Sequence, residues 1–198
     1  MAIGVGGLEQ SLIIYLHGFR SGPASHKAQQ LKTRLTALGH GDHYACPQLP
    51  VEPRAAIAIC EDLIAGSGRA VTLVGSSLGG YYATYLAEKH ALQAVLVNPA
   101  VVAHLSLLEY VGQQTNLYTG EIFAFTLAHI EQLRALEVPQ ISEPGNFWLL
   151  AETGDELLDY RLALAKYAGA RQSVLEGGDH SFTRWSDMLD DVIRFAGV

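Results

Sequence analysis

Short apolar segments alternate with helical patterns along most of this chain, and this alternation restricts the possible folds more than any other feature. Six apolar segments have the length of strands and run into loops that carry glycine or proline, at about 12–18, 43–50, 70–77, 93–100, 146–155 and 172–180. Helical spacing of apolar residues lies between and after them, at about 25–39, 53–65, 78–90, 157–168 and 183–196. Ser25 is the expected N-cap of the first helix. The pattern predicts an α/β fold, with a mostly parallel sheet of about six strands flanked by helices.

One stretch interrupts this alternation. About 45 residues, 101–145, separate two predicted strands and are rich in Leu, Phe and Tyr. A connection of this length usually carries its own helices or has a functional role. We therefore expect a small helical cap at the carboxyl side of the sheet, inserted in a single domain that spans residues 1–198.

The composition excludes several classes of partner. The chain has 49% hydrophobic residues and a formal net charge of -7, and its Lys and Arg residues are scattered. This balance argues against nucleic acid or an anionic membrane surface as a partner. Cys46 and Cys60 lack CxxC spacing, so we expect two free, buried thiols in a reducing compartment. The oligomeric state is not predicted.

The N-terminal segment MAIGVGGLEQ has no basic stretch followed by an apolar run, so no signal peptide is expected. No stretch reaches the ~18 apolar residues of a membrane span. These two observations predict a soluble, cytoplasmic protein.

The segment LVGSSLGGYY, residues 73–82, connects a buried strand to a helix. It lacks the lysine of a phosphate-binding P-loop, and its glycines do not have the spacing of a dinucleotide-binding fingerprint. The pattern GxSxG fits residues 75–79 and is typical of a nucleophile elbow, in which small residues flank a serine on a strained turn. This register selects Ser77 as the nucleophile and makes Ser76 the variable residue of the motif.

The first strand ends in His17-Gly18, upstream of the predicted elbow. In this architecture the loop after such a strand provides one backbone N–H of an oxyanion hole, and the residue after the nucleophile provides the other. We therefore predict that the N–H groups of Phe19 and Leu78 form the oxyanion hole. His17 is expected to hold this loop in place, because a catalytic base should follow the nucleophile in the chain.

Four histidines lie downstream of Ser77, and one of them is placed as a base should be. His180 follows the strand near 172–180 in a glycine-rich loop that can reach the carboxyl edge of the sheet. His90 ends a helix, where a cation needs no catalytic explanation. His104 and His129 lie in the insertion, where we expect solvent-exposed surface.

The acid is predicted by the same reasoning. Asp155 lies in a turn directly after a strand and 25 residues before His180, as expected for a carboxylate that orients an imidazole. Glu152 lies within the strand, and Asp179 is expected to cap its own loop. Glu156 and Asp159 resemble acidic residues of a first helical turn. Ser77, Asp155 and His180 are thus the predicted catalytic triad.

Four motifs in this order, HGFRSGP, GSSLGGYYA, TGDELLDY and GGDHSF, resemble those of the YqiA-like esterase family of small bacterial α/β hydrolases. The resemblance covers about residues 12–197 and implies a compact α/β-hydrolase fold and a serine esterase with the triad named above. One departure is the segment RSGP, where a serine-rich turn is expected after HGF, and it affects only the entrance near the oxyanion hole.

The predicted reaction is hydrolysis of a small-molecule ester with a small or medium acyl group through an acyl-enzyme, without a cofactor or a metal ion. Tyr81 and Tyr82 are candidate substrate-binding residues, although ordinary core packing explains them equally well. Two alternatives stay open. The same triad would serve an acyl-CoA thioesterase or an acyltransferase, and a hydrolase fold can also act as a non-catalytic binding protein.

Overall fold

The computed structural model describes residues 11–198. Its main sheet has six parallel strands in the order β2-β1-β3-β4-β7-β8, as the alternating pattern predicts. The strands are β1 (Leu12–Leu16), β2 (Tyr44–Ala45), β3 (Val71–Ser76), β4 (Gln93–Val97), β7 (Phe147–Glu152) and β8 (Arg171–Leu175).

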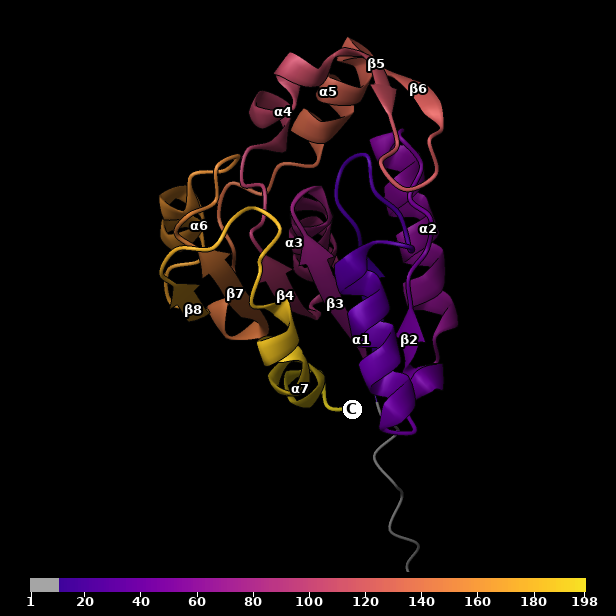
Figure 1. The fold of residues 1–198 in the computed structure, drawn as a ribbon, viewed down its shortest axis with the longest axis vertical. Helices are drawn as coiled ribbons and strands as arrows, with labels where there is room; N and C mark the ends of the chain where they lie inside the picture. The colour runs from indigo at the N-terminus through magenta and orange to yellow at the C-terminus, as the bar shows by residue number, and fades with distance from the viewer. Residues whose placement is uncertain (1–10) are drawn as a thin grey trace, which may run out of the picture.

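Helices cover both faces of this sheet (Figure 1). One face packs against α1 and α7, and the other packs against α2, α3 and α6, so the two hydrophobic cores lie on opposite sides of the strands. This two-sided coverage explains why the central strands are apolar throughout, because a strand between two helical layers has no solvent-facing side. The helices are α1 (His26–Ala37), α2 (Pro53–Gly66), α3 (Leu78–His90), α6 (Tyr160–Lys166) and α7 (Trp185–Phe195).

Strand β3 lies near the centre of the sheet, and all six of its residues are buried. Its register pairs Gly75 with Leu16 at the end of β1, and Ser76 with Val97 at the end of β4. The carboxyl ends of three neighbouring strands therefore meet at one edge of the sheet, which is where parallel α/β proteins bind their ligands.

The insertion between β4 and β7 lies above this carboxyl edge (Figure 1). It contains the expected helices, α4 (Ala103–Ser106) and α5 (Leu127–Ala135), but also an antiparallel hairpin of β5 (Gly112–Thr115) and β6 (Ile122–Phe125) that corrects the prediction of a purely helical cap. The polar sequence GQQT of β5 has no strand alternation to predict it. The hairpin turn is closed by Asn116, whose Oδ1 accepts the N–H groups of Tyr118 and Thr119.

Three short 3₁₀ turns complete the described secondary structure, at Gly41–His43, Leu108–Tyr110 and Pro144–Asn146. Cys46 and Cys60 are both free, as predicted, although Cys46 is only half-buried. Burial raises the pKa of Cys46 to about 11 and that of Cys60 to about 12. No helix within residues 11–198 is both long enough and apolar enough to cross a membrane. The N-terminal segment MAIGVGGLEQ, for which no signal peptide is expected, lies outside the described residues.

Candidate active site

Ser77 lies in the tight turn between β3 and α3, at the carboxyl edge of the sheet. Its φ of 55° and ψ of -119° fall in a region that residues other than glycine rarely adopt. The flanking glycines make this turn possible, because a Cβ at Gly75 would collide with the backbone of Gly79, and one at Gly79 would collide with the carbonyl of Leu16. The turn therefore has the strained geometry that the GxSxG motif predicts, with Ser77 at its apex and Ser76 as the buried last residue of β3.

Two loops bring His180 and Asp155 to Ser77. The Nε2 atom of His180 lies 3.0 Å from Ser77 Oγ, and its Nδ1 lies 2.8 Å from Asp155 Oδ2. Because Nδ1–H donates to the carboxylate, Nε2 carries the lone pair that accepts a hydrogen bond from the Ser77 hydroxyl. The structure thus brings together the three residues that the sequence analysis named, and a nucleophile, a base and an orienting acid have this arrangement.

The loop after β7 is shaped around the Asp155 carboxylate, whose side chain is only 2% exposed. Its Oδ1 accepts the N–H groups of Leu157 and Leu158, each at 2.9 Å. These bonds hold residues 155–158 in a turn, so α6 begins at Tyr160 and not near 157 as predicted. A carboxylate with three fixed donors is well placed to keep one orientation of the imidazole.

The predicted oxyanion amides lie on the other side of Ser77. Gly18 packs against Ser77, since a Cβ built on Gly18 would lie 3.3 Å from the Cβ of Ser77. Leu78 is the first residue of α3, so its N–H has no acceptor within the helix, and no residue of 11–198 accepts the N–H of Phe19. Both amides are therefore free to donate to a substrate oxygen.

His17 has the structural role that the sequence predicts for it. Its Nε2 accepts the N–H of Leu49 at 3.0 Å, and its Nδ1 donates to the carbonyl of Gly18 at 3.0 Å. This pattern requires a neutral imidazole, and burial lowers the pKa of His17 accordingly. His17 thus fixes the loop that carries the Phe19 amide.

A buried carboxylate at the end of β7 holds the loop of His180. Glu152 is fully buried, and its Oε1 accepts from Arg184 Nε at 2.9 Å. Its Oε2 accepts the N–H groups of Asp179 and Thr183, which lie on either side of His180. Burial raises the pKa of Glu152, but the hydrogen bonds from Arg184 and from the backbone outweigh burial, so the pKa is lowered. Glu152 is therefore ionised at neutral pH.

Asn98, the residue after β4, connects the same loop to the sheet. Its Oδ1 accepts the N–H of Glu152 at 2.9 Å, and its Nδ2 donates to the carbonyls of Asp179 and His180 at 3.0 and 3.3 Å. Sequence reasoning assigned no site role to Asn98 and placed Glu152 only within its strand. The one available signal was a polar residue at the end of an apolar strand.

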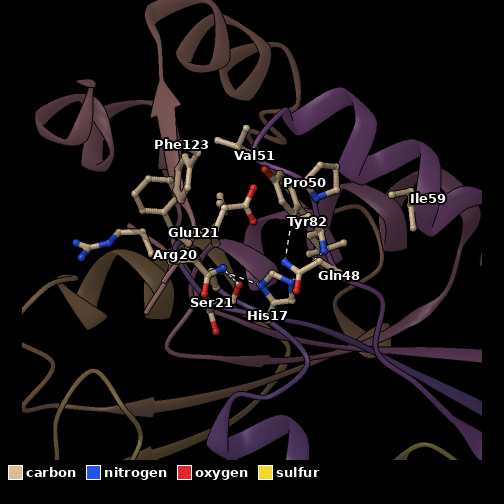
Figure 2. Close-up of a pocket in the computed structure, with 15 residues that line it drawn as sticks. His17, Arg20, Ser21, Gln48, Pro50, Val51, Ile59, Tyr82, Glu121 and Phe123 are labelled. Carbon is tan, nitrogen blue, oxygen red and sulfur yellow. Dashed lines mark hydrogen bonds between the residues drawn. The ribbon is translucent and has the colours of Figure 1, made fainter. Parts of the chain in front are cut away.

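An apolar pocket of about 390 Å³ opens beside the two free amides. In Figure 2 the carboxylate of Glu121 points toward the space beside Val51 and Pro50, while the guanidinium of Arg20 points away from the pocket. Arg20 Nε donates to the carbonyl of Thr115 on the hairpin at 3.0 Å. The apolar pocket is lined mainly by Phe19, Leu49, Pro50, Val51, Tyr82 and Phe123.

A second pocket of about 580 Å³ contains Ser77 and His180 themselves. Apolar atoms form most of its surface too, but we call it the polar pocket because Lys27, two histidines and several serines line it. Its other walls come from the first residues of α1, from Leu117 and Tyr118 of the hairpin turn, and from residues 181–185. The apolar and polar pockets share Gly18, Phe19 and Ser21, so they adjoin at the loop that carries the Phe19 amide.

The two candidate tyrosines have different positions. Tyr82 lines the apolar pocket, whereas Tyr81 lines neither pocket. Tyr81 is buried, and its hydroxyl donates to the carbonyl of Leu133 at 2.8 Å, which connects α3 to α5 of the insertion. The structure therefore places Tyr81 in the packing beneath the insertion and only Tyr82 where a substrate could contact it.

The other downstream histidines lie away from Ser77. His90 is the last residue of α3, beside Glu61, and His129 Nδ1 accepts the N–H of Thr126 at the start of α5. The prediction of a solvent-exposed His104 is wrong, because the packing of α4 against α5 leaves it only 8% exposed, beside Glu137.

Several solved structures share this arrangement of sheet and helices. A presumed hydrolase from Agrobacterium vitis S4 is 21% identical with a TM-score of 0.78, over 96% of this chain and 89% of that chain. Alpha/beta hydrolase domain-containing protein 10 from mouse is 16% identical with a TM-score of 0.70, over 92% and 89%. Est1E from Butyrivibrio proteoclasticus is 12% identical with a TM-score of 0.69, over 97% and 89%. The parallel sheet, the serine elbow and these similarities define an α/β-hydrolase fold.

Within this class the chain belongs to the uncharacterised protein family UPF0227, whose model matches residues 12–197. The match confirms the family that the four sequence motifs resemble, the YqiA-like esterases. It covers every residue of the elbow, of the loops that carry Asp155 and His180, and of both pockets.

Proposed function

We propose that this protein is a serine carboxylic-ester hydrolase that acts on small-molecule esters with small or medium acyl groups. The proposal rests above all on one contact, the 3.0 Å distance between Ser77 Oγ and His180 Nε2. A serine hydroxyl is a weak nucleophile unless a base lies within hydrogen-bond distance and is itself oriented by a third group, as Asp155 orients His180. The size of the apolar pocket, about 390 Å³, suits an acyl group of this length.

In the first step, Ser77 Oγ bonds to the ester carbonyl carbon while its proton passes to His180 Nε2. The carbonyl oxygen becomes an oxyanion that accepts hydrogen bonds from the N–H groups of Phe19 and Leu78, each worth about 2.7–4 kcal/mol in the transition state. The bond from the carbonyl carbon to the alcohol oxygen then breaks. His180 gives its proton to that oxygen, so the free alcohol leaves and the acyl group stays on Ser77.

In the second step, a water molecule gives a proton to His180 as its oxygen bonds to the acyl carbon. The bond to Ser77 Oγ breaks, and His180 returns the proton to that oxygen. The carboxylic acid is released and the free enzyme is restored. Asp155 stabilises the imidazolium in both steps, and water is the only co-reactant that they require.

The first experiment compares S77A with the wild type on p-nitrophenyl butyrate. We expect the rate to fall by at least about 10³-fold while the circular dichroism spectrum is unchanged, because the nucleophile is lost and the fold is kept. H180A should behave in the same way. H90A is its matched control, since His90 lies at the far end of α3. Unchanged turnover in S77A would contradict the proposal.

A fluorophosphonate provides a second test, because it labels an activated serine covalently. Peptide mapping should find the label on Ser77, and a label on Ser76 would contradict the assignment of the nucleophile. A panel of oxygen esters and acyl-CoAs of equal chain length then separates an esterase from a thioesterase by the ratio of kcat/KM. We also propose a reducing, cytoplasmic setting, with which the free thiols of Cys46 and Cys60 agree.

A further inference from the structure

The polar pocket has an unusual charge for this protein. The chain has 20 acidic and 13 basic side chains, yet the described residues that line the pocket include no aspartate or glutamate. They do include Lys27 and the two histidines His26 and His180. The apolar pocket next to it is lined by Glu121. Arg20 also lines that pocket, but its guanidinium points away from it (Figure 2). The charged groups that the two pockets beside Ser77 present to a ligand, Lys27 and Glu121, therefore differ in sign.

Lys27 has unused hydrogen-bonding capacity. Its Nζ donates to the carbonyl of Ser181 at 2.7 Å, and an ammonium group has two further N–H donors. Among residues 11–198, no carboxylate forms an ion pair with it, because Glu152 is paired with Arg184 and Asp155 with His180. Burial lowers the pKa of Lys27 to about 8, although the nearby carboxylates partly oppose this effect. These carboxylates lie too far away for an ion pair, so a bound anion would be the direct partner that the half-buried ammonium lacks.

The first turn of α1 faces the same pocket. This helix has 12 residues, and its N-terminus carries the positive end of the helix dipole. Ser25 is the N-cap residue, as predicted, but its side chain makes no capping hydrogen bond. Ser25 is 7% exposed and lines the pocket, and its Oγ has no partner within the described chain. Gln30 also lines the pocket, with an unpartnered Oε1. Of these two groups, the Ser25 hydroxyl can donate to an anion beside the Lys27 ammonium, whereas Gln30 Oε1 can only accept a hydrogen bond.

The position of His180 indicates which part of an ester would lie in the polar pocket. In the proposed reaction His180 Nε2 protonates the leaving oxygen, so the alcohol part must lie on the His180 side. His180 lines the polar pocket but not the apolar one, which is lined by Phe19 and Leu78. The acyl group therefore fits the apolar pocket, and the alcohol part fits the polar pocket.

We propose that the polar pocket binds an alcohol part that carries a carboxylate or a phosphate group, with Lys27 as its main anchor. This substrate class rests on the proposed esterase function. Binding by Lys27 adds a preference for esters of anionic alcohols. The triad alone has no such preference, because it acts on neutral and anionic esters alike. Glu121 disfavours the reverse orientation, in which the anion would lie on the acyl side.

Three butanoate esters with the same acyl group test this proposal. They are 4-(butanoyloxy)benzoate, 4-(butanoyloxy)phenyl phosphate and the neutral 4-(butanoyloxy)benzamide, and each kcat/KM is divided by the rate of hydroxide-catalysed hydrolysis of that ester. We expect at least one anionic ester to exceed the amide by about tenfold or more, as a hydrogen bond to a charged group implies. The two anionic esters separate a preference for carboxylate from one for phosphate. Equal values for all three would overturn the proposal.

The matched variants are K27M and K32M, which each remove one positive charge from α1. Lys32 is exposed and does not line the pocket. K27M should lower the ratio of anionic to neutral kcat/KM about tenfold, K27R should keep most of it, and K32M should not change it. The ratio is the readout because loss of the bond from Lys27 to Ser181 slows all three esters together. An equal loss for anionic and neutral esters in K27M would reduce Lys27 to a structural role and overturn the proposal.

Binding to S77A keeps this test independent of turnover. Isothermal titration of S77A with the benzoate and the benzamide esters should show tighter binding of the benzoate, and the K27M change should remove the difference. If wild type hydrolyses neutral esters without an anionic preference, only the present inference fails. If no ester is hydrolysed but S77A still prefers the anion, only the proposed reaction fails.

Discussion

The apolar pocket and the polar pocket meet at Gly18, Phe19 and Ser21, but they are built from different parts of the chain. Residues 48–51, with Glu121 and Phe123 of the insertion, form much of the apolar pocket, whereas the start of α1 and the loop of His180 form much of the polar one. The apolar pocket adjoins the amides that would hold the oxyanion, and the polar pocket contains the nucleophile and the base.

This difference separates two kinds of selectivity. The shape of the apolar pocket should decide which acyl chain fits, because apolar contacts discriminate by size. The charge of the polar pocket should decide which alcohol fits, because charged groups discriminate by the presence of a counter-charge. Changes on one side should therefore alter one selectivity and leave the other unchanged.

The largest effect is expected from Glu152, which holds the loop of His180 at the polar pocket, and it concerns the free energy of unfolding. Glu152→Ala leaves Arg184 and several backbone N–H groups without their buried acceptor, so we expect a loss of about 3–5 kcal/mol in the free energy of unfolding, measured with urea. Glu176 lies nearby but is exposed, and E176Q should change this free energy by less than about 0.5 kcal/mol. A loss in E152A no larger than that in E176Q would contradict the role of Glu152.

The Glu152 anchor also predicts how stability depends on pH. The pKa of Glu152 is lower in the folded protein than its ordinary value of 4.5. Its contribution is therefore complete above about pH 4.5 and is lost as the pH falls through the folded-state value. Thermal unfolding across this range should show a steeper loss of stability for the wild type than for E152Q.

The next effect concerns the charge of Lys27. Burial lowers the pKa of Lys27 to about 8, although the carboxylates of Asp179, Glu152 and Asp155 oppose this shift. Lys27 is therefore charged below this pH and neutral above it. The preference for anionic esters should therefore fall, by up to about tenfold, as the pH rises through about 8. The ratio of anionic to neutral ester rates cancels the titration of the triad. In K27R this ratio should not change with pH, because a guanidinium stays charged well above pH 8.

A smaller effect is expected from the size of the apolar pocket. Phe123 lines this pocket and packs edge-on against Phe19, with ring centroids 6.0 Å apart. Phe123→Ala should enlarge the pocket and favour longer acyl chains by about tenfold or less in a p-nitrophenyl ester series. The ratio of anionic to neutral alcohols should not follow this change. Ile122, whose side chain is largely exposed, provides the matched control I122A.

The smallest effect is expected from Glu121, an exposed carboxylate that water and salt partly screen. E121Q should raise the relative rate for an acyl group that ends in a carboxylate, such as the p-nitrophenyl monoester of adipic acid, by about threefold or less. E109Q removes an exposed charge of the insertion that does not line the pocket. A similar gain in E109Q would show that net charge, and not the apolar pocket, causes the effect.

The sequence predicted most of the sheet and the elements that surround Ser77. Elbow, strand and helix are local features, so glycine spacing and apolar periodicity over about ten residues were sufficient to place them. The order of motifs then located His180 and Asp155, because parallel strands end at one edge of the sheet. The β5–β6 hairpin was missed, since its polar strand has no periodic pattern and depends on the turn around Asn116.

The sequence by itself determined the α/β architecture, the serine elbow and the three residues that meet there. Only the tertiary structure decided what surrounds them. Lys27 contacts Ser181 across 154 positions, Glu152 contacts Arg184 across 32, and Asn116 Nδ2 donates to the carbonyl of Ser21 across 95. Such contacts depend on how loops return to the sheet, and no local period encodes that return. Contacts of this kind place Lys27 at one pocket and Glu121 at the other, and the selectivity that we propose depends on that placement.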